Sequence, residues 1–166
     1  MINKRKNQNG FTLLEMIVAV GIITFSALGI FSAVARYSQQ TQQERDNLVA
    51  AYLCQEGIEI VKNIRDTNWV SAAPSWKNGL TSCASGCEAD YSSSLTSWSS
   101  PGNSLYIQSS TGLYKYIGSP QSGDVQTPYT RKITITEVGN DELDISVDVY
   151  WTGNTMTVKE NIYNWK

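Results

Sequence analysis

The chain has 166 residues, a formal net charge of −2 and no histidine. That length suggests a single domain with enough chain to bury a core. The missing histidine excludes Ser-His-Asp and Cys-His catalysis within the chain. Because 13 basic residues stand against 15 acidic ones, no large basic face for nucleic acid is expected. We therefore expect no enzyme, no cofactor, no metal site and no nucleic-acid partner.

The N-terminal part of the chain is divided into a basic and an apolar zone. Residues 1–10 include three basic side chains, whereas residues 11–35 contain a single charge, Glu15. As a helix, residues 11–35 would be roughly 37 Å long, which is enough to cross a hydrocarbon core of about 30 Å. Because basic residues stay on the cytoplasmic side, the pattern predicts a single membrane pass with a cytoplasmic N-terminus and residues 36–166 exported.

Two ordinary interpretations of this N-terminus each leave a feature unexplained. A cleaved secretory signal could use the small residues Ala33-Val34-Ala35 as its cleavage site, but the apolar stretch exceeds the usual length of about 7–15 residues. A plain membrane anchor explains the length but not Glu15, since a carboxylate near the bilayer centre costs about 2.5–3.5 kcal/mol. Such a carboxylate is a functional candidate whose partner must be found.

The sequence GFTLLE at residues 10–15 resembles the N-terminal signal of type IV pilins and pseudopilins. Members of that superfamily carry a short basic leader, a glycine, an N-methylated phenylalanine, a T-L-x-E sequence and an apolar helix. The resemblance implies that a prepilin peptidase cuts between Gly10 and Phe11 at the cytoplasmic face of a bacterial inner membrane. It also implies N-methylation of Phe11 and retention of residues 11–35 as a transmembrane and filament-core helix.

Cleavage would change the charge and give Glu15 a partner. Loss of three of the 13 basic residues (Lys4, Arg5 and Lys6) leaves 10 against 15 acidic ones, a net of −5. The resemblance implies that Glu15 pairs with the N-terminal amine of a neighbouring subunit. Because an unpaired buried carboxylate is costly, that pairing would fix the axial register of the helices. Small side chains would let the helices approach closely: Gly21, Ser26, Ala27 and Gly29.

The helix is expected to run from about residue 11 to about residue 66. Beyond residue 47, apolar side chains recur at close to 3.6-residue spacing, which predicts that one face is buried against a sheet. Gly57 weakens a helix, but its lack of a side chain would let a strand approach. The apolar positions are Leu48, Val49, Tyr52, Leu53, Ile58, Ile60, Val61 and Ile64.

Residues 51–69 resemble a block of V-type minor pilins, A-x-x-L-x-Q-E-G-I-E-x-V-x-x-I-R-D. The charged residues of this stretch, together with Lys62, are expected to form weak pairs on a solvated helix face, with subunit contacts as the alternative. The matching residues are Gln55, Glu56, Gly57, Ile58, Glu59, Arg65, Asp66 and Trp69.

Residues 71–129 differ in composition from the helix. Fifteen of these 59 residues are serine and six are glycine, against five charged ones, which is typical of loops and short strands. Their aromatic content argues against disorder. Residues 105–107 and 113–117 predict a short hairpin.

The three cysteines are expected to have two different roles. Cys83 and Cys87 lie in a C-x-x-x-C sequence of an exported segment, where a small disulfide loop is expected. A zinc site would need further cysteine or histidine ligands. Cys54 is expected to be a buried free thiol on the helix, although mispairing through it stays open.

The C-terminal part has the strongest strand pattern. Apolar and polar residues alternate in 131–138 and 143–151, and more weakly in 155–165, which predicts an antiparallel meander over 131–165 with one solvated face. The apolar face would pack on the helix stripe, giving an α+β, type IV pilin-like fold. Both TPYTRKITI and the ending NIYNW resemble V-type minor pilins. Four acidic residues suit a solvated sheet face better than calcium: Asp141, Glu142, Asp144 and Asp148.

The sequence therefore predicts a minor type IV pilin. Its leader would span residues 1–10, its filament helix 11–35 and its exported domain 36–166, with adhesion carried by residues 71–129. Its expected partners are prepilin peptidase/methyltransferase, other pilin subunits and inner-membrane lipid. A pseudopilin of a type II secretion or DNA-uptake system is the alternative within the superfamily, and its final location would be a periplasmic pseudopilus. A single-pass anchored surface-binding module is the alternative of another class.

Overall fold

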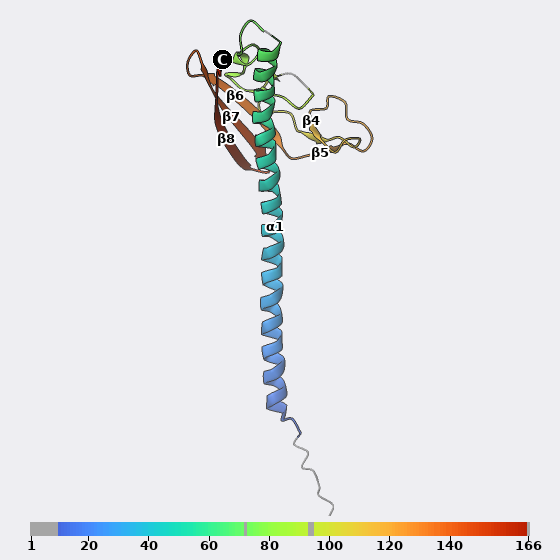
Figure 1. Cartoon of the computed structure of the whole chain (residues 1–166). Coiled ribbons are helices and arrows are strands. Elements are labelled where there is room, and N and C mark those ends of the chain that lie inside the picture. Colours follow the sequence, from blue (N-terminus) through green and yellow to red (C-terminus); the bar gives the residue numbers. More distant parts are fainter. Residues whose placement is uncertain (1–9, 72, 93–94, 166) are drawn as a thin grey trace, which may run out of the picture. The chain divides into compact units, whose positions relative to one another are not determined.

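The computed structural model describes residues 10–71, 73–92 and 95–165 (Figure 1). The chain divides into two compact units, and the boundary in the sequence follows Arg45. The predicted leader falls mainly on residues 1–9, which lie outside the described residues. We refer to residues up to Arg45 as unit 1 and to residues from Asp46 onward as unit 2.

Helix α1, Leu13–Val70, contributes to both units. It starts two residues later and ends four residues later than the sequence pattern indicates. The whole stretch lacks proline, and its two glycines in unit 1 are surrounded by good helix formers. The next proline is Pro74, just beyond the end of the helix, where proline is common because it cannot continue one.

The main sheet of unit 2 has five antiparallel strands in the order β2-β1-β6-β7-β8. Its three long strands are β6 (Thr130–Glu137), β7 (Glu142–Trp151) and β8 (Asn154–Tyr163), and they confirm the predicted meander. Strands β1 (Cys87–Glu88) and β2 (Thr96–Ser97) extend the sheet beyond β6. Residues of the Ser-rich region therefore complete the sheet, which the sequence pattern did not indicate.

The remaining strands form a small second sheet in the order β4-β3-β5. Strands β3 (Tyr106–Ile107) and β4 (Tyr114–Lys115) pair antiparallel, which confirms the predicted hairpin. Strand β5 (Val125–Gln126) pairs with the other edge of β3. A single 3-10 turn, η1 (Thr81–Cys83), precedes β1.

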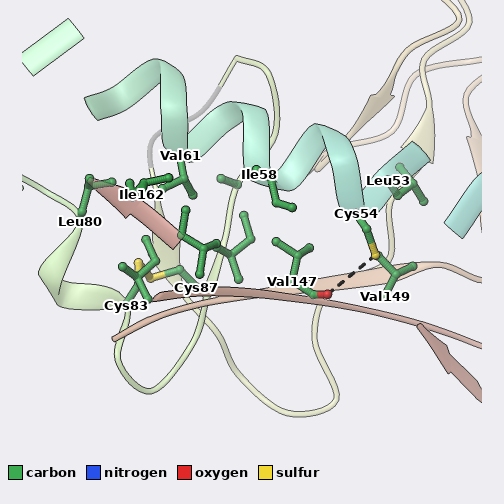
Figure 2. Packing of buried hydrophobic residues seen from close by; sticks show 14 of the residues in the cluster. Leu53, Cys54, Ile58, Val61, Leu80, Cys83, Cys87, Val147, Val149 and Ile162 are labelled. Atoms are coloured by element: carbon green, nitrogen blue, oxygen red, sulfur yellow. Dashed lines mark hydrogen bonds between the residues drawn. A yellow bond between two sulfur atoms is a disulfide. The ribbon is translucent and has the colours of Figure 1, made fainter. Parts of the chain in front are cut away.

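The core of unit 2 lies between the helix and the main sheet (Figure 2). Alternate residues of β7 are buried and their neighbours are partly exposed, as the period-two pattern predicts. The buried side chains of β7 are Leu143, Ile145, Val147, Val149 and Trp151. Facing them from α1 are Ala50, Leu53, Cys54, Gly57, Ile58 and Val61.

The prediction of which helix residues are buried against the sheet was wrong at two positions. Leu48 and Tyr52 are mainly exposed, whereas Ala50 is fully buried. Residues that are two positions apart in the sequence lie about 200° apart around a helix. Leu48 and Tyr52 are each two positions from Ala50, so both lie on the opposite side of the helix. The buried face of the helix combines the small residues Ala50, Cys54 and Gly57 with larger apolar ones.

Gly57 lies where the helix backbone comes close to side chains of the sheet. A Cβ atom at this position would lie 2.9 Å from Cγ1 of Val147 and 3.2 Å from Cδ of Arg131. Both distances are shorter than an ordinary van der Waals contact between carbons. The prediction that a small residue lets a strand approach here is confirmed.

Candidate processing and assembly site

Gly10, Phe11 and Thr12 precede the first residue of α1 and are exposed. The Phe11 side chain is 81% exposed, and a Cβ at Gly10 would meet no atom within 4 Å. A peptidase must enclose the bond that it cuts, so an accessible, non-helical segment suits this reaction. The predicted cleavage bond between Gly10 and Phe11 therefore lies in accessible chain directly before the helix.

Thr12 and Glu15 together start the helix. The Glu15 backbone N–H donates to Oγ1 of Thr12 at 3.3 Å, so Thr12 is the N-cap residue and Glu15 occupies the third helical position. The T-x-x-E spacing is that of a capping box, a signal which our sequence analysis missed. A carboxylate in the first turn also complements the helix dipole. Glu15 therefore has a local role in its own chain as well as the predicted role between chains.

The first part of the helix, residues 13–35, is almost entirely apolar. An 18-residue window has a mean hydropathy of 2.3, none of it is buried, and the helix is long and apolar enough to cross a membrane. A helix of this kind suits a membrane or the interior of a bundle. Large exposed side chains occur throughout the segment, including Leu14, Ile17, Val18, Ile22, Phe25, Leu28 and Phe31.

The hydroxyl groups of this segment are satisfied inside the helix. Oγ1 of Thr24 donates to the Val20 carbonyl at 2.7 Å, and Oγ of Ser26 donates to the Ile22 carbonyl at 2.8 Å. Apolar surroundings offer no water to such groups. The internal bonds allow these small polar residues to face lipid or another helix without an unpaired donor.

The two glycines of this segment have no packing role inside the described chain. A Cβ at Gly21 or Gly29 would meet no atom within 4 Å. This contrasts with Gly57, where the space is filled by the sheet. Any close contact that Gly21 and Gly29 make must therefore come from outside the described chain.

Comparison with protein families decides what this segment is. Residues 5–31 match the prokaryotic N-terminal methylation motif. This N-terminal segment therefore has the methylation signal that type IV pilin and pseudopilin precursors carry. Comparison with curated proteins and with solved structures gave no match. The matched motif implies processing by a prepilin peptidase and assembly with other pilins, and one long helix packed on an antiparallel sheet agrees with a pilin-like fold.

In unit 2, Arg131 is the main polar residue that the sequence pattern did not single out. Its side chain is fully buried. Nη1 donates to the Leu53 carbonyl at 3.0 Å and to Oε2 of Glu56 at 2.9 Å, while Nη2 donates to the Ala89 carbonyl. The period of β6 could have revealed it, because Arg131 shares a strand face with Ile133 and Ile135. The guanidinium joins the helix, β6 and the segment after β1.

Two buried carboxylates hold the Ser-rich region in place. Glu88 accepts hydrogen bonds from the backbone N–H and the side-chain amide of Asn103, at 2.7 and 2.6 Å. Asp90 accepts from the backbone N–H groups of Ser92 and Tyr116 at 2.9 Å. Burial raises the pKa of Tyr116, whose hydroxyl donates to the Arg131 carbonyl at 3.0 Å. This region is therefore ordered by paired polar groups as well as by its aromatic side chains.

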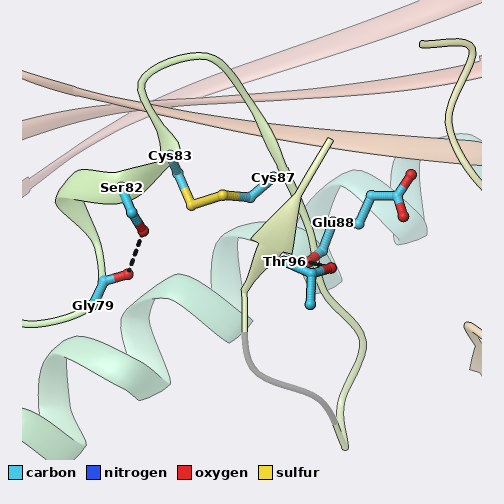
Figure 3. Close-up of a disulfide and its surroundings, with 6 residues drawn as sticks. All are labelled: Gly79, Ser82, Cys83, Cys87, Glu88 and Thr96. Atoms are coloured by element: carbon cyan, nitrogen blue, oxygen red, sulfur yellow. Dashed lines mark hydrogen bonds between the residues drawn. A yellow bond between two sulfur atoms is a disulfide. The ribbon is translucent and has the colours of Figure 1, made fainter. Parts of the chain in front are cut away.

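Cys83 and Cys87 are joined in a disulfide beside β1 (Figure 3). Cys54 is a buried free cysteine whose Sγ lies 3.7 Å from the Val147 carbonyl oxygen. Burial raises the pKa of the Cys54 thiol to about 11, so it stays protonated and unreactive at neutral pH.

The charged residues of the helix find partners of two kinds. Arg65 pairs with the adjacent Asp66 at 2.7 Å, as a helix-face pair, but Lys62 reaches across to Glu160 on β8 at 2.6 Å. Both pairs are partly exposed and contribute little stability. Glu160 lies on the inward side of an edge strand, a placement that discourages further strands from pairing with that edge.

The acidic residues around the β6–β7 turn are engaged with neighbouring polar groups. Asp141, Glu142 and Asp148 accept hydrogen bonds from Asn164, Asn161 and Thr157, respectively. Within the described ranges, no group of three or more histidine, cysteine, aspartate or glutamate side chains is placed to hold a metal ion.

Proposed function

We propose that this chain is a minor type IV pilin, a structural subunit that enters a pilus or primes its assembly. The observation that supports this most strongly is the methylation motif at residues 5–31, followed by a helix whose apolar side chains are uncovered within unit 1. Uncovered apolar surface of this extent needs lipid before assembly and other helices afterwards. The function is assembly, and the chemistry is carried out on the chain by other proteins.

The first step is cleavage at the cytoplasmic face. The peptidase hydrolyses the peptide bond between Gly10 and Phe11, which releases the basic leader and leaves a free amine on Phe11. Methylation of that nitrogen follows, and the amine stays cationic. The mature subunit has a net side-chain charge of −5, because 10 basic residues remain against 15 acidic ones.

The second step is lateral association of the helices. The Glu15 carboxylate pairs with the Phe11 amine of a neighbouring subunit, which offsets the cost of placing both charges among apolar helices. Gly21 and Gly29, which have open space around them, let neighbouring helices approach closely. The pairing sets the axial position of each subunit, and the apolar contacts hold it there.

Two segments with V-type resemblance support the assignment as a minor pilin. The first is the helical block around Glu56 and Gly57, and the second is the β6 segment that contains Arg131. Arg131 pairs with Glu56 and lies against Gly57, so the two segments depend on each other in the fold. We assign adhesion to the surface of residues 71–129, where several serine side chains and Tyr91 are exposed.

Mass spectrometry of the mature protein tests the processing step. We expect an N-terminal N-methyl-Phe11, whereas a chain that starts at Arg36 would show a cleaved secretory signal instead. An unprocessed Met1 terminus would leave only an anchored surface-binding module.

Incorporation of Glu15 variants into sheared filaments tests the assembly step. Glu15→Gln retains a capping-box residue but removes the charge, so we expect normal membrane insertion with a loss of incorporation. Incorporation of Glu15→Gln at the wild-type level would contradict the charge pairing. Recovery of the wild-type chain with a periplasmic secretion complex instead of surface filaments would favour a pseudopilin.

A further inference from the structure

Unit 2 contains an open groove of about 820 Å³ that takes no part in processing or assembly as described above. Its walls come from three segments: residues 98–104, the first part of β6, and the hairpin that joins β7 to β8. All three segments belong to unit 2 and are described by the structure. The groove therefore lies wholly within unit 2.

Two aromatic rings form one wall of the groove. The ring centroids of Trp98 and Tyr150 are 6.0 Å apart, and their planes are inclined by 36°. Both residues line the groove and are partly exposed. Exposed aromatic faces offer apolar contact without the conformational freedom of a long aliphatic side chain.

The position of the Trp98 ring is set by its surroundings. Its backbone N–H donates to the Gly86 carbonyl at 3.1 Å. The ring lies against Gly102, where a Cβ atom would be only 2.2 Å from Cη2 of Trp98. Gly102 also has a φ of 89°, which few other residues adopt easily. The ring is thus held in place before any ligand arrives, which lowers the entropic cost of binding.

The remaining lining combines hydroxyl and amide groups with Pro101, Pro128 and Trp151, and it is almost uncharged. Among the described residues that line the groove, Lys132 is the only charged one, and it stands opposite Asp148 in the register of β6 and β7. Hydroxyl groups both donate and accept hydrogen bonds, and an amide does the same with separate atoms. Such groups are contributed by Ser100, Ser104, Thr130, Thr152, Asn154 and Thr155.

The hairpin that carries part of this lining has an unusual backbone. Thr152 has a φ of 42° and is followed by Gly153 with a φ of 80°. A β-branched residue rarely adopts a positive φ, and such outliers cluster at functional sites. Asparagine would suit this turn position better, so the threonine hydroxyl is kept at the rim at a conformational cost.

We propose that this groove binds a neutral oligosaccharide. A sugar ring presents a face of C–H groups, which suits the Trp98 and Tyr150 rings, and a rim of hydroxyl groups, which suits the Ser, Thr and Asn side chains. The lack of carboxylates in the described lining disfavours a cationic peptide, and a single lysine disfavours a polyanion. Display of the groove on a pilus rests on the proposed function, whereas binding by the purified chain does not.

The test is a glycan array probed with the detergent-solubilised full chain. The array carries neutral oligosaccharides beside sialylated and sulfated ones, and titration calorimetry with the best neutral glycan follows. We expect saturable binding of a neutral glycan. Binding confined to anionic glycans, or no binding of any neutral glycan at 10 mM (about 2.7 kcal/mol), would overturn the proposal.

Three variants place the binding in the groove. We expect Trp98→Ala to weaken binding at least tenfold. Thr155→Trp retains both rings but fills the opening from an exposed position on β8, so it should abolish binding. Tyr163→Ala removes an exposed aromatic residue outside the groove and should bind like the wild type. If Thr155→Trp unfolds as cooperatively and at the same temperature as the wild type and still binds with wild-type affinity, the groove is not the site.

Discussion

The same helix has two different relations to its surroundings. In unit 1 its large apolar side chains are exposed on every side, whereas in unit 2 one face is buried against a sheet. Composition alone would suggest that the more apolar half is the half inside the protein. The opposite arrangement shows that the apolar half is built for an environment outside its own chain, and that only the amphipathic half contributes to the fold of unit 2.

Replacing one leucine in each unit should give the largest difference in the free energy of unfolding. Leu53 is 2% exposed and Leu28 is 65% exposed. Leu53→Ala should lower the free energy of unfolding of unit 2 by about 2–5 kcal/mol because it leaves a cavity. Leu28→Ala should leave that value unchanged. Denaturant unfolding of the detergent-solubilised chain, followed by tryptophan fluorescence, measures both, and equal effects would contradict the separation of the units.

The free energy of unfolding should fall at alkaline pH because Cys54 is buried. The folded-state pKa of this thiol is raised from 9.0 to about 11 by burial. Below pH 9 the thiol is protonated in the folded and unfolded chains, so it adds no pH dependence. Between pH 9 and 11 the unfolded chain releases its proton first, so the free energy of unfolding falls by about 1.4 kcal/mol for each pKa unit of difference.

Cys54→Ala removes this titration and serves as the matched control. Its pH profile of stability should be flatter than that of the wild type between pH 9 and 11, with tyrosine ionisation common to both. Parallel profiles for the two proteins would show that Cys54 is accessible to solvent.

Equivalent glycine substitutions should have opposite signs. Gly57→Ala places a Cβ 2.9 Å from a Val147 methyl group and should destabilise unit 2 by about 1–3 kcal/mol through overpacking. Gly21→Ala meets no atom within 4 Å and should favour the helix by about 1 kcal/mol. Thermal unfolding monitors the first and helical circular dichroism the second. A stabilising Gly57→Ala would mean that the sheet moves away at little cost.

The smallest effect should come from the helix cap. Thr12→Ala removes the acceptor of the Glu15 N–H and should weaken the first turn by about 1 kcal/mol, while Thr12→Ser should retain it. Amide hydrogen exchange over residues 13–16 is the appropriate measurement, because the change is confined to one turn. Exchange in unit 2 serves as the internal control and should not differ between the variants.

Much of unit 2 could be predicted from local patterns. The period-two alternation in β7 gave both the strand and its buried face, and the turns around residues 139 and 153 gave its ends. The helical stripe was assigned less accurately, because large apolar residues such as Tyr52 lie on the solvated side. At the candidate processing site, the motif predicted Gly10, Phe11 and Glu15, and the T-x-x-E spacing that marks the helix start was present in the sequence but was missed.

The sequence by itself determined the N-terminal segment, because a methylation motif and a helix that is apolar all round are local features that need no distant contact. Only the tertiary structure shows that Arg131, Glu88 and Asp90 are buried and paired, because their partners lie 15 or more residues away in the chain. Only the tertiary structure shows the groove at Trp98 and Tyr150, because three segments that are separate in the sequence form it. The strand period places Arg131 on the apolar face of β6, but the groups that satisfy its charge come from distant segments, and no local pattern identifies them.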